Sequence, residues 1–97
     1  MFVVCVTFEI QPKQYAAFRQ AVQNQAANSL QQEADCHVFD VCINADHDTV
    51  FLYEHYSDRA AFDAHLQSQH FLNFDAQTRP WVLNKSVTSW KLLEHTT

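Results

Sequence analysis

Basic side chains, long apolar runs and low-complexity segments are scarce or absent in this sequence. Six Lys and Arg stand against eleven Asp and Glu, which gives a net charge of −5, and the six are scattered along the chain. Nucleic-acid binding needs a basic face, so we expect no nucleic-acid partner. The same shortage disfavours a highly phosphorylated substrate, although Arg59, Arg79 and Lys85 are available to hold one anionic group.

No apolar run reaches the roughly 18 to 20 residues that cross a bilayer. Residues Met1–Cys5 lack the basic start and small-residue cleavage site of a signal peptide. We therefore expect no membrane partner and a cytoplasmic location. The three cysteines, Cys5, Cys36 and Cys42, show no CxxC spacing, and we interpret them as reduced packing residues.

What is present is the composition of a folded domain. Hydrophobic residues make up 47% of the chain and aromatic residues 13%, so disorder is not expected. A chain of this length buries only roughly 60–65% of the surface that its unfolded form exposes. We expect one domain over residues 1–97 with a thin core.

Hydrophobic periodicity predicts six elements in the order βαββαβ. The expected elements are strands over Phe2–Ile10, His37–Asn44, Thr49–Tyr56 and Lys85–Leu93, a helix from Pro12 to about Gln32, and a second helix capped by Ser57 or Asp58. Residues 44–48 have the composition of a hairpin turn. Residues 69–83 are predicted to be helical in their first half, with Pro80 ending the helix.

This order predicts a ferredoxin-like α+β fold, in which two helices cover one face of a four-stranded antiparallel sheet. The strand over Phe2–Ile10 is largely apolar on both sides, so the second face of the sheet needs a cover as well. A second copy of the chain is the simplest cover. The pattern therefore predicts a homodimer.

Two segments resemble the antibiotic biosynthesis monooxygenase family. Residues 53–65, Tyr-Glu-His-Tyr-Ser-Asp-Arg-Ala-Ala-Phe-Asp-Ala-His, followed by His70 and Phe71, carry most of the likeness, and residues 33–41 resemble the entry to the family's second strand. The resemblance implies a dimeric α/β barrel and the cofactor-free quinol and anthrone-type monooxygenases found among its members. Similar small proteins act in haem breakdown, lactone isomerisation and isomerisation of quorum-signal sugars, and fold alone does not choose among these.

The chain departs from that family at one turn. Members often carry Gly before the second strand, where this chain has Asp35, and this chain has no Gly at all. Asp tolerates a left-handed conformation better than most residues. The haem-degrading branch carries Trp in place of His65, and its iron-ligating His falls near Asp75, so we expect no haem.

His65 is the first candidate for chemistry. Its spacing from Ala61 and Phe62 turns it toward the sheet, and an imidazole with an ordinary pKa near 6.5 is a natural proton acceptor. The alternative is a core histidine satisfied by a backbone carbonyl. Only the family resemblance favours the functional interpretation.

His70 follows five residues later, which is about 140° further round a continuous helix. This is not the i, i+4 spacing of two zinc ligands on one helix, so we expect no metal. We predict instead that His70, Phe71 and Phe74 lie at a substrate pocket.

Glu54 lies inside an apolar strand, where a carboxylate needs a partner or a raised pKa. It is predicted to orient an imidazole, to accept a proton, or to pair with a basic group of the other subunit. Tyr53 and Trp81 are predicted to form flat pocket walls and to donate hydrogen bonds to a substrate, although aromatic residues at such spacing are more often core residues.

Together these features predict a cofactor-independent monooxygenase of a small aromatic quinol or polyketide-like compound. His65 is expected to be the base, Glu54 its orienting partner, and Tyr53 or Trp81 a donor. Two alternatives remain: an isomerase of a small carbonyl compound such as a quorum-signal sugar, and a non-catalytic module that binds a small ligand.

Overall fold

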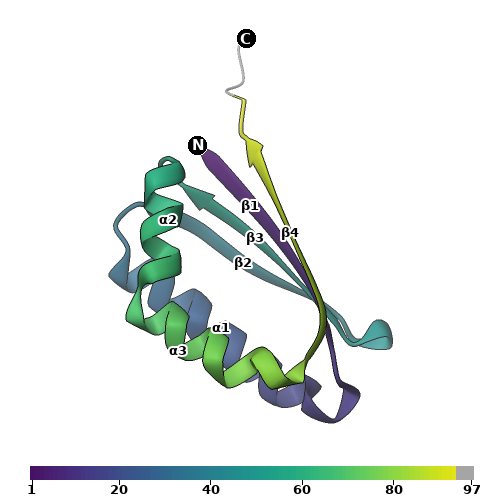
Figure 1. Ribbon diagram of the computed structural model, residues 1–97. Coiled ribbons are helices and arrows are strands. Elements are labelled where there is room, and N and C mark those ends of the chain that lie inside the picture. Colours follow the sequence, from purple (N-terminus) through teal and green to yellow (C-terminus); the bar gives the residue numbers. More distant parts are fainter. Residues whose placement is uncertain (94–97) are drawn as a thin grey trace.

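The computed structural model describes residues 1–93, which form a four-stranded antiparallel sheet with three α-helices packed on one face (Figure 1). The strands are β1 (Phe2–Ile10), β2 (Cys36–Asn44), β3 (Thr49–Tyr56) and β4 (Val82–Lys91), in the order β2-β3-β1-β4. The helices are α1 (Tyr15–Gln32), α2 (Arg59–Gln67) and α3 (Gln69–Thr78), with 3-10 turns η1 (Pro12–Gln14), η2 (Ala45–His47) and η3 (Arg79–Trp81). The predicted ferredoxin-like α+β fold is confirmed.

The helix predicted after Ser57 or Asp58 is α2, and the helical first half predicted for residues 69–83 is α3. They are separate helices because the backbone of Ser68 is extended (φ −68°, ψ 148°). The Asp58 carboxylate caps α2 by accepting from Ala61 N at 2.8 Å, and Ser68 Oγ caps α3 by accepting from Phe71 N at 3.3 Å. This break turns the chain between α2 and α3, and it was not predicted.

Two further details differ from the sequence-based expectation. Strand β4 begins at Val82 and ends at Lys91, so the predicted strand was placed about two to three residues too late. Among the described residues, the left-handed backbone falls at Asp48 (φ 49°), after η2, and not at Asp35. Asp48 makes the tight return from β2 into β3, where Asp tolerates a positive φ.

The core lies between α1 and the inner face of the sheet. Alternating residues of β1 and β3 point toward the helices and pack against the apolar stripe of α1. The core residues include Val4, Phe8, Phe18, Val22, Val50 and Leu52. The rings of Phe8 and Phe18 lie 5.0 Å apart between centroids. By contrast, α2 supplies a single buried residue, His65. The sheet is therefore tightly covered by α1 and only loosely by α2.

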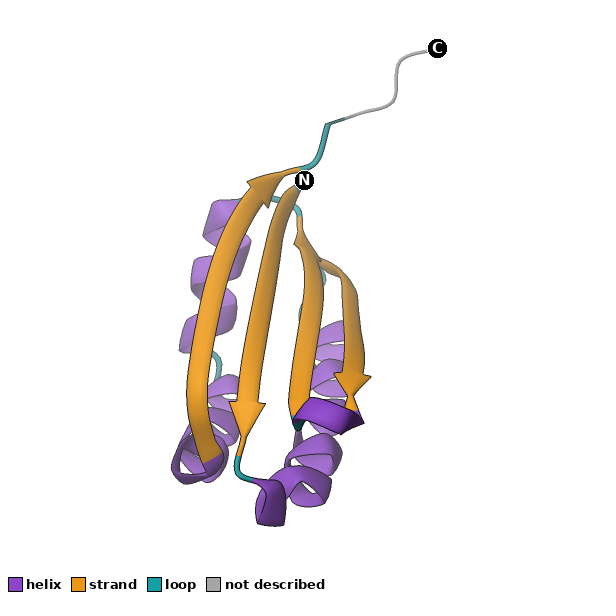
Figure 2. Cartoon of the chain, turned by 90° about the vertical axis from the view of Figure 1, so that its right-hand side faces the viewer, coloured by secondary structure: helices purple, strands orange, loops and turns teal. Residues whose placement is uncertain are grey.

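The other face of the sheet carries no helix (Figure 2). In the paired registers it presents Val3, Cys5 and Thr7 of β1, Phe51, Tyr53 and His55 of β3, Val38, Asp40 and Cys42 of β2, and Ser86, Thr88 and Trp90 of β4. We call this set the open face. Its Cys42 is exposed, so the expected packing role does not hold for that cysteine within the single chain. No helix among residues 1–93 is long and apolar enough to span a membrane.

Candidate functional site

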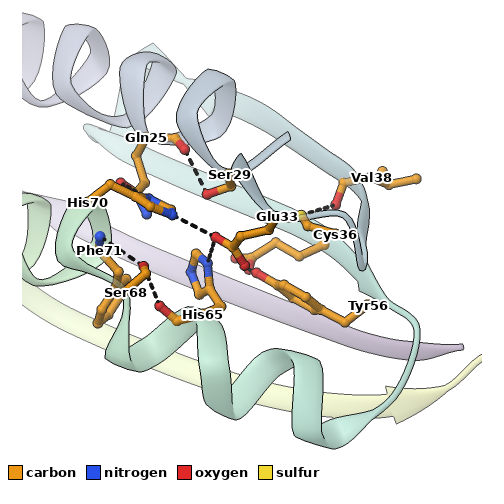
Figure 3. A network of polar contacts seen from close by, with 11 residues as sticks. Gln25, Ser29, Glu33, Cys36, Val38, Tyr56, His65, Ser68, His70 and Phe71 are labelled. Atoms are coloured by element: carbon orange, nitrogen blue, oxygen red, sulfur yellow. Dashed lines mark hydrogen bonds and ion pairs between the residues drawn. The ribbon is translucent and has the colours of Figure 1, made fainter. Parts of the chain in front are cut away.

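A carboxylate and two imidazoles meet where α1 ends beside α2 and α3 (Figure 3). Glu33 directly follows α1, and its Oε2 atom lies 2.8 Å from His65 Nδ1 and 2.8 Å from His70 Nε2. The ligand-type atoms of these three residues all lie within 4.8 Å of one another. We call them the Glu33 cluster.

The break at Ser68 explains why both histidines reach Glu33. On one continuous helix they would point about 140° apart, whereas here their ring centroids are 5.8 Å apart. Ser68 Oγ donates to the carbonyl of His65 at 2.7 Å while it caps α3. The same serine therefore ends one helix, begins the next and brings His70 beside His65.

His65 is a buried imidazole, 3% exposed, among aromatic rings. Its centroid lies 5.1 Å from that of Phe71 and 5.4 Å from that of Tyr56. Burial lowers the pKa of His65 below its ordinary 6.5, although the hydrogen bond and charge of Glu33 act in the opposite direction. The imidazole is therefore predominantly neutral at pH 7.

The contact with Glu33 fixes which ring nitrogen of His65 carries the proton. An ionised carboxylate only accepts hydrogen bonds, so His65 donates Nδ1–H to Glu33. The other nitrogen, Nε2, has no hydrogen-bond partner among residues 1–93 and is not among their buried unpaired atoms. A neutral imidazole in this tautomer presents a lone pair at Nε2, as a general base requires.

His65 lines a small cavity of about 40 Å³ between the helices and the sheet. The apolar walls include Val6, Phe8, Leu52, Phe62, Leu66, Phe71 and Phe74, and the polar groups are Gln25, Glu54, His65 and Lys85. This volume holds about one water molecule, far less than the roughly 300–1,000 Å³ of ordinary ligand pockets. Since Leu66 and Val87 at its margin are exposed, the cavity approaches solvent between α2 and β4.

Glu54 is the second titratable group at this cavity. It is 2% exposed and accepts a 2.5 Å hydrogen bond from the hydroxyl of Tyr56. Burial raises the pKa of Glu54 to about 7, against the opposing effects of Tyr56 and Lys85. Burial and the neighbouring Glu54 also raise the pKa of Tyr56, so its phenol remains a donor. The expectation that Glu54 orients His65 is corrected, because the hydrogen-bond partner of that imidazole is Glu33.

Lys85 of β4 supplies a positive charge at the margin of the cavity. Its Nζ lies 5.4 Å from the ring centre of Phe8 and 5.9 Å from that of Phe71, within the range of a cation–π contact. From the sequence, Lys85 is predicted only as one of three cations that are available to hold an anionic group. The available signal was strand alternation, which places Lys85 on the same side of β4 as Val87.

The other predicted pocket residues divide between three places. Phe71 and Phe74 line the cavity with His65. His70 and Trp81 line instead a groove of about 500 Å³ between α1 and α3. Tyr53 lies on the open face, because its neighbour in β3 points toward the helices. The structure therefore brings His65, Glu54, Phe71 and Phe74 together and leaves Tyr53 and Trp81 outside this cavity.

Glu33 was missed as a site residue, although it stands inside the segment that carried the family resemblance. Its partner His65 lies 32 positions away in sequence, and a contact of that separation cannot be read from local periodicity. Gln25 was missed for the same reason: its Oε1 lies 3.3 Å from His70 Nδ1, a contact across 45 positions.

The chain belongs to the antibiotic biosynthesis monooxygenase family, whose sequence profile matches residues 1–77. Among solved structures it is similar to Rv0793 from Mycobacterium tuberculosis, at 27% identity over 99% of this chain and 98% of that chain, with a TM-score of 0.87. A Nitrosomonas europaea protein provisionally named antibiotic biosynthesis monooxygenase is 25% identical over 97% of this chain and 100% of its own, with a TM-score of 0.89. Comparison with curated proteins gives no match.

Proposed function

We propose that this protein is a cofactor-independent monooxygenase that abstracts a proton from a small aromatic quinol or a related polyketide-like compound. The observation that carries the proposal is the buried Glu33–His65 pair, in which Nδ1–H donates to a carboxylate and Nε2 has no hydrogen-bond partner within residues 1–93. Membership of the family supports the use of oxygen.

In this reaction the substrate supplies the electrons. His65 Nε2 takes a proton from the substrate, and the resulting electron-rich anion reduces O₂ directly. For an anthrone-like CH₂ group, one oxygen atom becomes the new carbonyl oxygen, and the other leaves as water with the two hydrogens. Neither a metal nor an organic cofactor is needed for this balance.

Each polar residue at the cavity has a role in such a step. Glu33 holds the imidazole in its basic tautomer and stabilises the imidazolium that forms. Lys85 stabilises the negative charge that develops on the substrate oxygen. Glu54, with a pKa of about 7, is a proton donor or acceptor to the same oxygen, while Phe71 and Phe74 limit the access of water.

Substrate entry requires the cavity to open, since about 40 Å³ does not hold an aromatic ring. We place this opening between α2 and β4. Helix α2 contributes only His65 to the buried residues, and Leu66 and Val87 at the margin are exposed. A helix held by so few buried side chains is the element that moves at least cost.

The functional unit that we propose is a homodimer in which a second copy covers the open face. Trp90 on this face is 61% exposed, and Phe51 and Tyr53 are half-buried. The Nε2 atom of His55 is buried there without a partner among the described residues. Apolar rings beside an unpaired polar atom favour a protein partner over bulk water as the cover.

Oxygen uptake measured with a panel of quinols, naphthols and anthrones tests the function. The expected result is one O₂ consumed per product for at least one compound. His65→Asn, which keeps an N–H donor near Nδ1 and removes Nε2, should lower kcat/KM about 100-fold or more, whereas the exposed-site control His37→Asn should not. Conversion without oxygen uptake contradicts the monooxygenase proposal in favour of an isomerase, and binding without any conversion contradicts catalysis.

A further inference from the structure

We propose that the Glu33 cluster is a binding site for one divalent transition-metal ion of the Zn²⁺ type, and that the bound ion switches His65 off as a base. One carboxylate and two imidazoles are the ligand set that zinc and its first-row neighbours favour. They come from three separate segments: the end of α1, the body of α2 and the start of α3.

The positions of the three ligand atoms are close to those of a metal site. Metal–ligand distances of about 2.0–2.1 Å in a tetrahedral site put neighbouring ligand atoms about 3.3 Å apart. Both oxygen–nitrogen distances are 2.8 Å, and no pair in the cluster exceeds 4.8 Å. Small side-chain rotations suffice, and Glu33 is free to make one because it lies beyond the last residue of α1 and is 16% exposed.

His70 makes the cluster incomplete without a cation. Its side chain is 8% exposed, and its Nε2 lies 2.8 Å from Glu33 Oε2 without forming a hydrogen bond, so this buried nitrogen has no hydrogen-bond partner among residues 1–93. Gln25 Oε1 lies 3.3 Å from the other ring nitrogen and accepts its proton. The buried Nε2 atom therefore lies beside a carboxylate oxygen without a hydrogen bond, and a metal ion bound to both atoms would supply the missing partner.

The surroundings also fit a cation. The ion-pair partners of Glu33 among residues 1–93 are the two histidines, so no Lys or Arg of these residues pairs with this carboxylate. The Gln25 contact has the form of an outer-shell hydrogen bond that orients a metal-binding histidine. A surface hollow lined by Glu33, Asp35 and Ala64 provides a route from solvent to the carboxylate.

The proposed effect of the metal ion on His65 rests on the proposed function, in which His65 Nε2 is the base. A neutral imidazole carries one proton, which lies on Nδ1 while Glu33 accepts it. A metal bound at Nδ1 displaces this proton to Nε2, with no net release from the ring. The nitrogen that is proposed to act as the base then becomes a donor and cannot take a proton from a substrate.

Titration of chelator-treated protein with Co²⁺, followed by visible ligand-field absorption, and calorimetric titration with Zn²⁺ test the site. One ion per chain is expected. Glu33→Gln and His65→Asn should each weaken Zn²⁺ binding about 100-fold or more, Gln25→Leu about 10- to 100-fold, and the control His37→Asn should leave it unchanged. Binding that survives the cluster substitutions, or that is weak and of no fixed stoichiometry, overturns the site.

A second test measures the ¹⁵N resonances of the histidine rings in the unmodified chain. It does not depend on whether the variants fold. Zn²⁺ should shift the resonances of His65 Nδ1 and His70 Nε2, and shifts confined to other histidines contradict the proposal. These readouts need no substrate, so they stand whether or not the monooxygenase proposal survives. Where a turnover assay exists, stoichiometric Zn²⁺ should abolish turnover, and turnover unchanged at full occupancy overturns the switch.

Discussion

At the scale of single residues, Glu54 is a side chain whose protonation near neutral pH depends on the fold. Its carboxyl group has an ordinary pKa of 4.5 and a pKa of about 7 in the folded protein, chiefly because it is buried. Between these values the native state keeps a proton that the unfolded chain releases. Stability therefore falls as pH rises from about 4.5 to about 7 and levels off above that range.

Glu54→Gln removes this dependence while keeping an oxygen that accepts from Tyr56. We expect the variant to gain stability relative to the parent between pH 5 and pH 8, by at most about 3 kcal/mol. Urea unfolding at both pH values measures the difference. The exposed-site control Glu9→Gln should show no such change, and an equal difference between Glu54→Gln and the parent at both pH values would contradict the role of burial.

Lys85 is expected to act through its charge. Lys85→Met keeps most of the aliphatic stem and removes the cation beside Phe8 and Phe71. Because the side chain is partly in solvent, we expect kcat/KM to fall about tenfold. Lys91→Met, on the same strand and side, is the matched control. Equal effects of the two substitutions would show that Lys85 has no specific role at the cavity.

At the scale of elements, periodicity predicted β1 and β3 to the residue and α1 closely, because their apolar positions repeat at 2.0 and 3.6 residues. The break between α2 and α3 was missed because Ser68 is neither Gly nor Pro and the helical pattern continues across it. The Glu33–His65 contact was missed because it depends on where α1 ends relative to α2. Local pattern thus predicted the fold and the side of the helix on which His65 lies, but not the partner of His65.

Ser68→Ala tests the importance of this break. The substitution removes the hydroxyl that accepts from Phe71 N and donates to the carbonyl of His65. We expect a loss of about 1 kcal/mol of stability, as for other serine caps, measured by urea unfolding. Ser89→Ala on β4 is the control. Equal stability of the two variants would show that the Ser68 hydroxyl does not stabilise the break between α2 and α3.

At the scale of the whole molecule, the aromatic residues of the open face predict that the protein is a homodimer. Light scattering at micromolar concentration should give twice the chain mass of 11.3 kDa. Phe51→Asp should shift the protein toward the monomer, because it places a charge in the proposed interface. Leu30→Asp, at an exposed apolar position on α1, should not. A monomeric parent protein would contradict the proposed dimer.

Composition describes the whole chain, but the predictions drawn from it are less specific than the prediction of the fold. Charge and hydropathy predicted the absence of nucleic-acid and membrane partners and a cytoplasmic location, and these stay predictions. The family resemblance is confirmed over residues 1–77. Neither composition nor fold predicts the substrate, because the cavity of about 40 Å³ is too small for an aromatic ring.

The central claim is that Glu33 holds His65 as a neutral base with its free nitrogen at Nε2. A long-range ¹H–¹⁵N spectrum of the histidine rings at pH 7 tests it directly. The account predicts a protonated Nδ1 and an unprotonated Nε2 for His65, and a change in this tautomer in Glu33→Gln. A His65 ring protonated at Nε2, or at both nitrogens, would contradict it.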